Sequence, residues 1–326
     1  MRPLEEIIAG IIAAEGPMRL DRYMALCLGH PEHGYYGRGP LRIGRHGDFY
    51  TAVSVGPLYG RLLAQLAERI WHALGEPDDF TVIEQGAHDG QLMEDVARGF
   101  ETAGSPQAGL ARFIIVEANE KYRATQSARL APQLGARLSW VNEMADLTGA
   151  PAHAIFITNE LLDAMPVQLL LRQGGQWHER GVTLEQGAFV WQDRPTPLAP
   201  PIPIEGTHDY LTEIHPQAEA FVRTLGEKLR RGALLLIDYG FGEREYYHPQ
   251  RHMGTLMCHR AHQADDNPLV DVGAKDITAH VNFTGIVLAA QEQPLPVGQE
   301  WQLLGYTSQA HFLINCGLPQ AMEQAP

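Results

Sequence analysis

The stretch Val82-Ile83-Glu84-Gln85-Gly86-Ala87-His88-Asp89-Gly90 decides the fold of this chain. An apolar run typical of a buried strand begins at Phe80 and ends in the acid Glu84, and a turn containing glycine then leads into a helical stretch. In open α/β sheets, ligands bind at the carboxyl ends of the strands, where turns of this kind lie. The turn matches neither common phosphate-binding pattern, because His88 and Gln91 replace glycines of G-x-G-x-x-G and no Gly-Lys-Ser/Thr ending follows.

From Phe80 onward, short apolar runs alternate with helical stretches. Continuous apolar runs of this length, separated by helices, predict a parallel sheet with crossover helices. The expected fold class is therefore α/β, with a Rossmann-like sheet. We expect strands at 80–83, 113–116, 138–141, 154–157 and 233–239, and helices at 57–74, 91–100, 121–130 and 216–231.

The remaining segments predict an N-terminal arm and an insertion. Residues 1–76 are expected to form a helical arm with a long loop, and residues 77–326 the domain that contains the sheet. A β-rich insertion is expected within this domain at about 167–231. Its apolar runs, with Gly174-Gly175 as a turn, predict antiparallel strands, and the prolines between 194 and 203 predict a semi-rigid link.

Composition and charge exclude several classes of protein. The chain has 25 Lys and Arg against 39 Asp and Glu, and a net charge of −14 repels both nucleic acid and anionic membrane surfaces. Three widely spaced cysteines form no disulfide framework and indicate a reducing compartment. No apolar run approaches the roughly 18 residues that span a bilayer, and the early acids Glu5 and Glu6 do not fit a targeting signal. We therefore expect a cytoplasmic protein with no nucleic-acid partner and no membrane insertion.

Polar residues also end two further predicted strands. Glu117 follows the strand at 113–116 and is suited to accept hydrogen bonds from two ribose hydroxyls. Asn142 follows the strand at 138–141 and suits an adenine edge. S-adenosylmethionine carries both of these groups and an ammonium, so the three strand ends together favour it as the ligand. The alternative interpretation is that strand ends are polar because they border solvent.

Longer motifs show a resemblance to a known family. They are Tyr23-Met24, His30-Pro31-Glu32-His33-Gly34-Tyr35-Tyr36, Gly47-Asp48-Phe49-Tyr50-Thr51, Asn159-Glu160-Leu161-Leu162-Asp163-Ala164-Met165-Pro166, Asp238-Tyr239-Gly240, Gly254-Thr255-Leu256 and Asp276-Ile277-Thr278-Ala279-His280-Val281-Asn282-Phe283. With these motifs and the Glu84 turn, nearly the whole chain resembles the MidA-type family of class I S-adenosylmethionine-dependent methyltransferases. The mitochondrial members of that family are respiratory complex I assembly factors with protein-arginine methyltransferase activity.

The resemblance implies S-adenosyl-L-methionine as the cofactor and no metal. The cofactor-binding residues that we expect on this basis are Glu84, Gly86, Ala87, Gly90, Glu117, Asn142 and Asn159. The sequence departs from the family at one position of the turn, which usually reads E-x-G-x-G-x-G. His88 replaces the middle glycine, and its side chain is expected to narrow the approach to the methionine part of the cofactor.

Glu160 and Asp163 are the candidate catalytic residues. Glu160 follows the predicted strand at 154–157, where class I methyltransferases place the group that faces the transferred methyl. Asp163 comes three residues later, so one helical turn would bring both carboxylates to one side. An arginine guanidinium stays protonated, and carboxylates orient it through bidentate hydrogen bonds. The alternative is that Glu160 caps the turn and that Asp163 is solvated.

Several weaker patterns have two interpretations each. Asp48 and Thr51 form either a lid over the cofactor or turn and capping residues. The segment 276–280 is typical of a helix start and borders either the substrate cleft or the core. Tyr35 and Tyr36 either cage a substrate cation or anchor the core. Two groups contain cysteine and histidine, but neither has the paired spacing of a zinc site, namely Cys27/His30/His33 and Cys258/His259/His262.

The activity that the resemblance implies is methylation of an arginine side chain in a protein substrate, such as a respiratory-complex subunit. Two alternatives remain open from the sequence. A small-molecule O- or N-methyltransferase would use the same cofactor site with a closed, apolar acceptor pocket. A non-catalytic assembly factor would keep the fold without turnover, and His88 is the feature that favours it.

Overall fold

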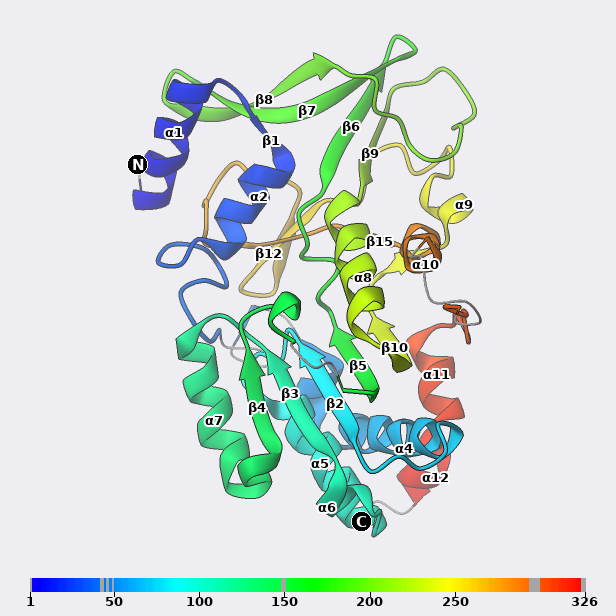
Figure 1. Ribbon diagram of the computed structural model, residues 1–326. Coiled ribbons are helices and arrows are strands. Elements are labelled where there is room, and N and C mark those ends of the chain that lie inside the picture. Colours follow the sequence, from blue (N-terminus) through cyan, green and yellow to red (C-terminus); the bar gives the residue numbers. More distant parts are fainter. Residues whose placement is uncertain are drawn as a thin grey trace. The chain divides into compact units, whose positions relative to one another are not determined.

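The computed structural model describes residues 2–41, 44, 47–48, 50–147, 151–292 and 300–323 (Figure 1). Two compact units interleave along the chain. The hairpin unit comprises Met1–Arg38, Leu161–Arg223 and Asp238–Glu292, and the parallel-sheet unit comprises Gly39–Glu160, Thr224–Ile237 and Gln293–Pro326. The expected arm at 1–76 is therefore divided between them at residue 38. Phe49, from one of the sequence motifs, lies outside the described residues.

Five parallel strands in the order β10-β5-β2-β3-β4 form the centre of the parallel-sheet unit (Figure 1). Their bounds are β2 Phe80–Gln85, β3 Arg112–Val116, β4 Leu138–Val141, β5 His153–Asn159 and β10 Arg231–Ile237. This sheet confirms the predicted α/β class. The strand order runs outward from β2 to β4 on one side and from β5 to β10 on the other. The order thus reverses between β2 and β5, and open α/β sheets bind their ligands at the carboxyl ends of the strands beside such a point.

Three helices pack against this sheet through one hydrophobic core, namely α4 Leu58–Ala73, α5 Gln91–Ala103 and α7 Glu120–Leu134. Two glycines allow α4 and α5 to approach each other closely. A Cβ atom added at Gly60 would lie 2.3 Å from Cβ of Asp95, and one added at Gly99 would lie 2.6 Å from Cβ of Ala64. The shorter elements of this unit are α3 Ala52–Val55, α6 Gln107–Leu110, the 3-10 helices Gly135–Arg137 and Met144–Asp146, α11 Gln309–Asn315 and α12 Leu318–Glu323.

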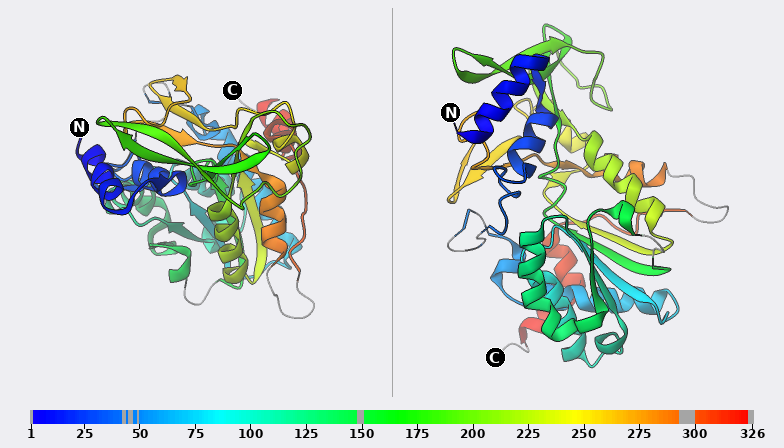
Figure 2. Two further views of the ribbon diagram at one scale, coloured as in Figure 1. Left: turned by 90° about the horizontal axis from the view of Figure 1, so that it is seen from above. Right: turned by 60° about the vertical axis from the view of Figure 1, so that its left-hand side comes forward.

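The hairpin unit contains an antiparallel sheet in the order β1-β7-β6-β9, with β8 paired to β7. Its strands are β1 Met18–Arg19, β6 Gln168–Gln173, β7 Gln176–Glu185, β8 Ala188–Pro195 and β9 Tyr210–Ile214. Gly174 and Gly175 both have positive φ, 58° and 79°, as a tight two-residue hairpin turn requires. The predicted antiparallel strands are therefore confirmed, whereas β9 was not predicted. Figure 2 shows the long β7–β8 ribbon beside α1 Pro3–Glu15 and α2 Leu20–Gly29.

The segment expected to start a helix at Asp276 is a strand, so that prediction is wrong. β14 Asp276–Thr278 pairs antiparallel with β12 Met257–Arg260. The β-branched residues Ile277 and Thr278 suit a strand, and the helix begins only at α10 Phe283–Gln291, where Oδ1 of Asn282 accepts a hydrogen bond from the amide of Gly285 at 3.3 Å. The unit's other elements are α8 Pro216–Lys228 (which continues into the parallel-sheet unit), β11 Gly240–Phe241, α9 Glu243–Tyr246, β13 Gln263–Asp265 and β15 Val281–Asn282.

Among the described residues, no helix is both long enough and apolar enough to cross a membrane.

Candidate active site

Four of the sequence-predicted residues lie along one edge of the parallel sheet. Glu84 is the penultimate residue of β2, Glu117 directly follows β3, Asn142 directly follows β4, and Asn159 is the last residue of β5. Because all these strands are parallel, their carboxyl ends meet at the same edge of the sheet. Two of the four, Glu84 and Asn159, belong to the two strands at which the strand order reverses.

The turn after β2 depends on three residues with left-handed backbone conformation. Gly86, His88 and Gly90 have φ angles of 78°, 46° and 84°. Positive φ is uncommon for residues other than glycine, which explains why a turn with this geometry favours glycine at every second position. Gly90 is also the N-cap of α5, and a Cβ atom there would lie 3.0 Å from Cδ1 of Leu130.

His88 keeps the left-handed conformation and engages its side chain in other contacts. Its Nε2 donates a hydrogen bond to the carbonyl oxygen of Leu41 at 2.8 Å. The ring also packs edge-on against Tyr122, with 5.8 Å between ring centroids. The backbone carbonyl of His88 accepts a hydrogen bond from Nε2 of Gln126 at 2.9 Å. The imidazole therefore ties the β2–α5 turn to the segment at residue 41.

Glu84 presents a buried acceptor that no described residue satisfies. Its side chain is 4% exposed, and Oε2 has no hydrogen-bond partner in the described part of the chain. Burial, with a smaller contribution from the charge of Asp89, raises the pKa of Glu84 to about 8. A buried polar atom without a partner is costly, so a ligand that donates a hydrogen bond here would remove that cost. The ammonium and hydroxyl groups of S-adenosylmethionine are such donors, and this edge therefore fits the cofactor that the sequence predicts.

Glu117 and Asn142 are held in place by neighbouring groups. Oε1 of Glu117 accepts a hydrogen bond from the amide of Asn119 at 2.8 Å, and burial raises the pKa of Glu117. Oδ1 of Asn142 accepts a hydrogen bond from Nη2 of Arg123 at 2.9 Å. These contacts fix both side chains at the ends of β3 and β4.

Tyr59 joins this edge although nothing in the sequence singled it out. Its hydroxyl donates to Oδ1 of Asn159 at 2.6 Å, and its side chain is 5% exposed. Burial raises the pKa of Tyr59, and the charges of Glu160 and Glu84 raise it further. In the sequence Tyr59 stands at the start of a helix whose apolar stripe suggested only a packing role, so the signal was hidden.

Glu160 directly follows β5, in a conformation that rules out the predicted helical turn. Its φ angle is 52°, and its amide donates to the carbonyl oxygen of Ile237 at 2.8 Å. The following residues through Asp163 form no helix. The prediction that a helical turn aligns Glu160 with Asp163 is wrong. The amide of Glu160 donates to Ile237 of β10, and the amides of residues 161–163 donate to Asp238, instead of to carbonyl groups within a helical turn.

Asp238, the residue after β10, accepts hydrogen bonds from the segment that follows Glu160. Its Oδ2 accepts from the amides of Leu161, Leu162 and Asp163 at 3.0, 2.7 and 3.3 Å. Its Oδ1 accepts from the amide of Tyr239 at 2.9 Å. The sequence indicated Asp238 only as part of a family motif and gave it no role.

Asp163 belongs to a second group of residues from the sequence motifs, which lies in the hairpin unit. The Tyr36 hydroxyl donates to Oδ1 of Asp276 at 2.8 Å. Burial raises the pKa of Tyr36, and the charges of Asp276 and Asp163 raise it further. Asp163 is 8% exposed, Asp276 is 4% exposed, and the carbonyl of Asp163 accepts from the amide of Ala279 at 2.8 Å. Residues from three sequence motifs that lie far apart along the chain therefore interact with one tyrosine hydroxyl, Asp276 through a hydrogen bond and Asp163 through its charge.

The structure shows structural contacts for Tyr35 and Thr51, two residues for which the sequence left a site role and a structural role open. Tyr35 is buried in the core. Oγ1 of Thr51 accepts from the amide of Ser54 at 3.3 Å, which makes Thr51 the N-cap of α3. Among the residues that the structure describes, no group of three or more His, Cys, Asp or Glu is arranged to hold a metal ion.

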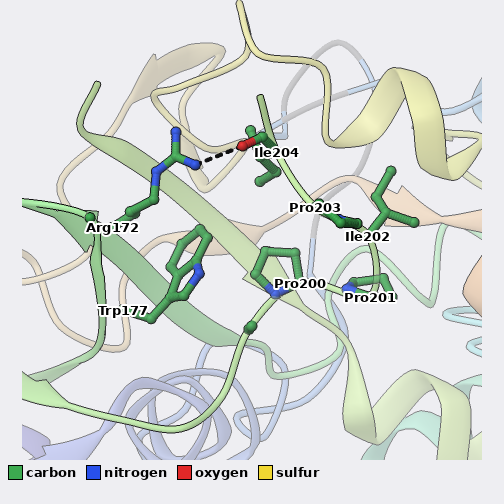
Figure 3. Close-up of a pocket in the computed structure, with 9 residues that line it drawn as sticks. Arg172, Trp177, Pro200, Pro201, Ile202, Pro203 and Ile204 are labelled. Atoms are coloured by element: carbon green, nitrogen blue, oxygen red, sulfur yellow. Dashed lines mark hydrogen bonds between the residues drawn. The ribbon is translucent and has the colours of Figure 1, made fainter. Parts of the chain in front are cut away.

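A pocket of about 420 Å³ lies in the hairpin unit, and its lining includes none of the residues that the sequence predicted for the site (Figure 3). Nη1 of Arg172 donates to the carbonyl of Ile204 at 2.8 Å, and its guanidinium lies over the Trp177 ring at 5.8 Å. The guanidinium also donates to the carbonyl of His208. These contacts fasten the proline-rich segment to β6, so the predicted semi-rigid link forms one wall of this pocket.

Comparisons with known proteins agree with this geometry. A family model of S-adenosyl-L-methionine-dependent methyltransferases matches residues 62–298. A crystal structure of a Burkholderia thailandensis protein bound to S-adenosyl-homocysteine is 38% identical to this chain, with a TM-score of 0.87, and the match covers 99% of this chain and 83% of that one. A native crystal structure from the same organism is 36% identical, with a TM-score of 0.84 and coverage of 99% and 82%.

Relatives with curated names are more distant. The mouse protein arginine methyltransferase NDUFAF7, mitochondrial, is 26% identical over 334 residues, which cover 94% of this chain and 72% of the mouse protein. The human protein of the same name is 25% identical over 334 residues, covering 94% of this chain and 71% of its own length. The family model covers most of the chain, and the site at the strand ends of this chain fits the cofactor. This protein therefore belongs to the family of S-adenosyl-L-methionine-dependent methyltransferases that the model describes.

Proposed function

We propose that this methyltransferase transfers the methyl group of S-adenosylmethionine to an arginine side chain of a protein. The observation that carries the proposal is a pair of buried acids: Asp276 accepts a hydrogen bond from the Tyr36 hydroxyl, and the charge of Asp163 acts on the same hydroxyl. Buried carboxylates favour a cationic partner over a neutral one. The distant relatives named protein arginine methyltransferases support the same acceptor.

The cofactor supplies an electrophilic methyl group on a sulfonium, which is transferred by in-line displacement. We propose that the cofactor is held at the edge of the parallel sheet by seven residues: Glu84, Gly86, Ala87, Gly90, Glu117, Asn142 and Asn159. The unsatisfied oxygen of Glu84 supports this assignment, as does the bond from Tyr59 that fixes Asn159.

On the acceptor side, we assign Glu160 and Asp163 the catalytic role. A guanidinium keeps its proton at neutral pH, so the enzyme has to orient one nitrogen and localise the charge on the others. Carboxylates perform both tasks through charge-assisted hydrogen bonds. Glu160 lies at the end of β5, where its charge acts on the Tyr59 hydroxyl.

Two finer assignments belong to the same proposal. The resemblance to complex I assembly factors makes a respiratory-complex subunit the first acceptor to test. The charge and cysteine content of the chain support a cytoplasmic location, which cell fractionation measures directly.

Methyl transfer to a whole-cell protein extract tests the proposed acceptor. The purified protein is incubated with the extract and S-adenosylmethionine labelled in the methyl group, and the proteins are then hydrolysed in acid. We expect the label in methylarginine. Label in extracted small molecules and none in protein would instead support a small-molecule methyltransferase. Binding of S-adenosylhomocysteine without any transfer would support a non-catalytic assembly factor.

A further inference from the structure

We propose that Asp238 is a positioning residue, which fixes the backbone of Leu161–Asp163 and thereby sets the direction of the Asp163 carboxyl group. The inference rests on the proposed function, because it takes Asp163 as one of the groups that orient the methyl acceptor. Asp238 itself is assigned no contact with the acceptor or with the cofactor.

The Asp238 carboxylate accepts hydrogen bonds from several backbone amides at once. Three consecutive amides, those of Leu161, Leu162 and Asp163, donate to a single oxygen, Oδ2. A run of successive N–H groups pointing to one spot is the arrangement that proteins use to bind anions. Here the anion is supplied by the chain itself, 75 residues beyond Asp163. These three amides therefore have one common acceptor, and its removal affects all of them at once.

The Asp163 main chain is held on both sides of its Cα atom. Its amide donates to Asp238, and its carbonyl oxygen accepts from the amide of Ala279 at 2.8 Å. Two fixed peptide groups leave little freedom to the Cα–Cβ direction of the residue between them. Because Ala279 follows β14, one anchor comes from that strand and the other from the end of β10.

The position of Asp238 in the chain explains why this residue carries the anchor. In the parallel-sheet unit, Ile237 is paired with Asn159, and its carbonyl accepts from the amide of Glu160. Asp238 is the next residue after Ile237, and Leu161 is the next after Glu160. The side chain of Asp238 thus takes over the bonding of the amides at the point where the β5–β10 ladder ends.

The protonation state of Asp238 agrees with this role. Burial raises its pKa to about 6, while the four amides that donate to it oppose the rise. At neutral pH the carboxylate is therefore charged and accepts all four hydrogen bonds. Hydrogen bonds to a charged group are stronger than hydrogen bonds between neutral groups.

The test compares the variants Asp238→Asn and Asp238→Ala with Asp193→Asn as a matched control. Asp193 also belongs to the hairpin unit, and its carboxylate pairs with Arg180 on the neighbouring strand. Each purified variant is examined by amide hydrogen exchange of the peptide that contains residues 161–163. The affinity for S-adenosylhomocysteine is measured by calorimetry, and kcat and KM are measured from labelled-methyl transfer into the protein extract.

For Asp238→Asn we expect exchange of the three amides to accelerate by about tenfold or more, which corresponds to a loss of about 1.4 kcal/mol of local protection. We expect kcat to fall by about tenfold, while the affinity for S-adenosylhomocysteine and the unfolding temperature stay close to those of the Asp193→Asn control. Asp238→Ala is expected to show the same pattern more strongly. A purely structural role would instead lower the unfolding temperature and all functional parameters together.

Two results would overturn the inference. Unchanged exchange at residues 161–163 in a folded Asp238→Asn protein would show that the carboxylate does not hold these amides. Accelerated exchange with wild-type kcat would show that it holds them without serving the reaction. If the wild-type protein itself transfers no methyl to protein, the proposed function fails and the assignment of Asp238 fails with it.

Discussion

The hydroxyl of Tyr59, on α4, donates a 2.6 Å hydrogen bond to Oδ1 of Asn159, the last residue of β5. This bond joins the first long helix of the parallel-sheet unit to the strand end at which the strand order reverses. The bond also fixes the orientation of the Asn159 side-chain amide, because Oδ1 has to face the Tyr59 hydroxyl.

Tyr59→Phe removes this donor and keeps the ring that packs in the core. We expect the affinity for S-adenosylhomocysteine to fall by about three- to tenfold, since a single neutral hydrogen bond contributes about 0.5–1.5 kcal/mol. The measurement is calorimetric titration of the variant beside the wild type. Tyr210→Phe in the hairpin unit, which also removes the hydroxyl of a buried tyrosine, is the control, and an equal loss in both variants would remove Tyr59 from the site.

Gly86→Leu is expected to abolish cofactor binding. Gly86 has a φ angle of 78°, which a branched side chain tolerates poorly, and the new side chain would occupy the turn on which the cofactor is expected to rest. Gly104→Leu is the control, because Gly104 also has a positive φ of 65° and a Cβ atom there would meet nothing within 4 Å. We expect similar unfolding temperatures in both variants and loss of S-adenosylhomocysteine binding only in Gly86→Leu. Undiminished binding by a folded Gly86→Leu protein would rule out this turn as the cofactor site.

His88→Gly tests whether the departure from the family turn affects the cofactor. The imidazole is engaged with Leu41 and Tyr122, so its removal is expected to change the affinity for S-adenosylhomocysteine by less than about threefold. Hydrogen exchange at the residues around Leu41 is expected to increase, since the anchor of this segment is lost. A large gain in affinity would mean that the ring obstructs the cofactor, and a large loss would mean that it contacts the cofactor.

The buried carboxyl group of Glu84 predicts a specific dependence of stability on pH. Its pKa is raised to about 8 in the folded protein, so between its ordinary pKa and about 8 the folded chain keeps a proton that the unfolded chain releases. The free energy of unfolding therefore decreases as the pH rises through this range. We expect Glu84→Gln to lessen this decrease, because raised carboxyl pKa values such as that of Asp238 also contribute to it, and to be more stable than the wild type at pH 8 by about 1–3 kcal/mol. Urea unfolding at pH 5.5 and pH 8 measures the effect, and parallel curves for both proteins would show that Glu84 is not the group responsible.

The parts of the fold that were predicted correctly depend on short-range patterns. The run 113–116 is apolar throughout, in keeping with the buried side chains of Phe113, Ile115 and Val116 and the half-buried side chain of Ile114, and such a run can be recognised without any tertiary information. The prediction that Glu84 and Glu117 lie at one edge follows from the parallel sheet, since parallel strands bring their carboxyl ends together. Gly174 and Gly175 likewise made the β6–β7 turn predictable, because the positive φ angles of a tight hairpin turn favour glycine.

The wrong or missing predictions all depend on partners that are distant in the sequence. Asp276 resembled a helix start, but pairing with β12 made the segment a strand. The segment after Glu160 resembled a helical turn, but its amides donate to Asp238, a residue that sequence spacing does not connect with it. The role of Tyr59 was missed for the same reason, because its hydroxyl finds its acceptor 100 residues later.

The catalytic assignment is tested most directly by Glu160→Gln, assayed for both methyl transfer and cofactor binding. The substitution keeps the shape of the side chain and removes the charge that would orient a guanidinium. We predict that labelled-methyl transfer to protein arginine falls by about a hundredfold or more. The affinity for S-adenosylhomocysteine should stay within about threefold of the wild type, and Asp163→Asn should show the same pattern more weakly. Full transfer activity in Glu160→Gln would contradict the catalytic role of Glu160, and an equal loss of transfer and binding would place Glu160 in the cofactor site instead.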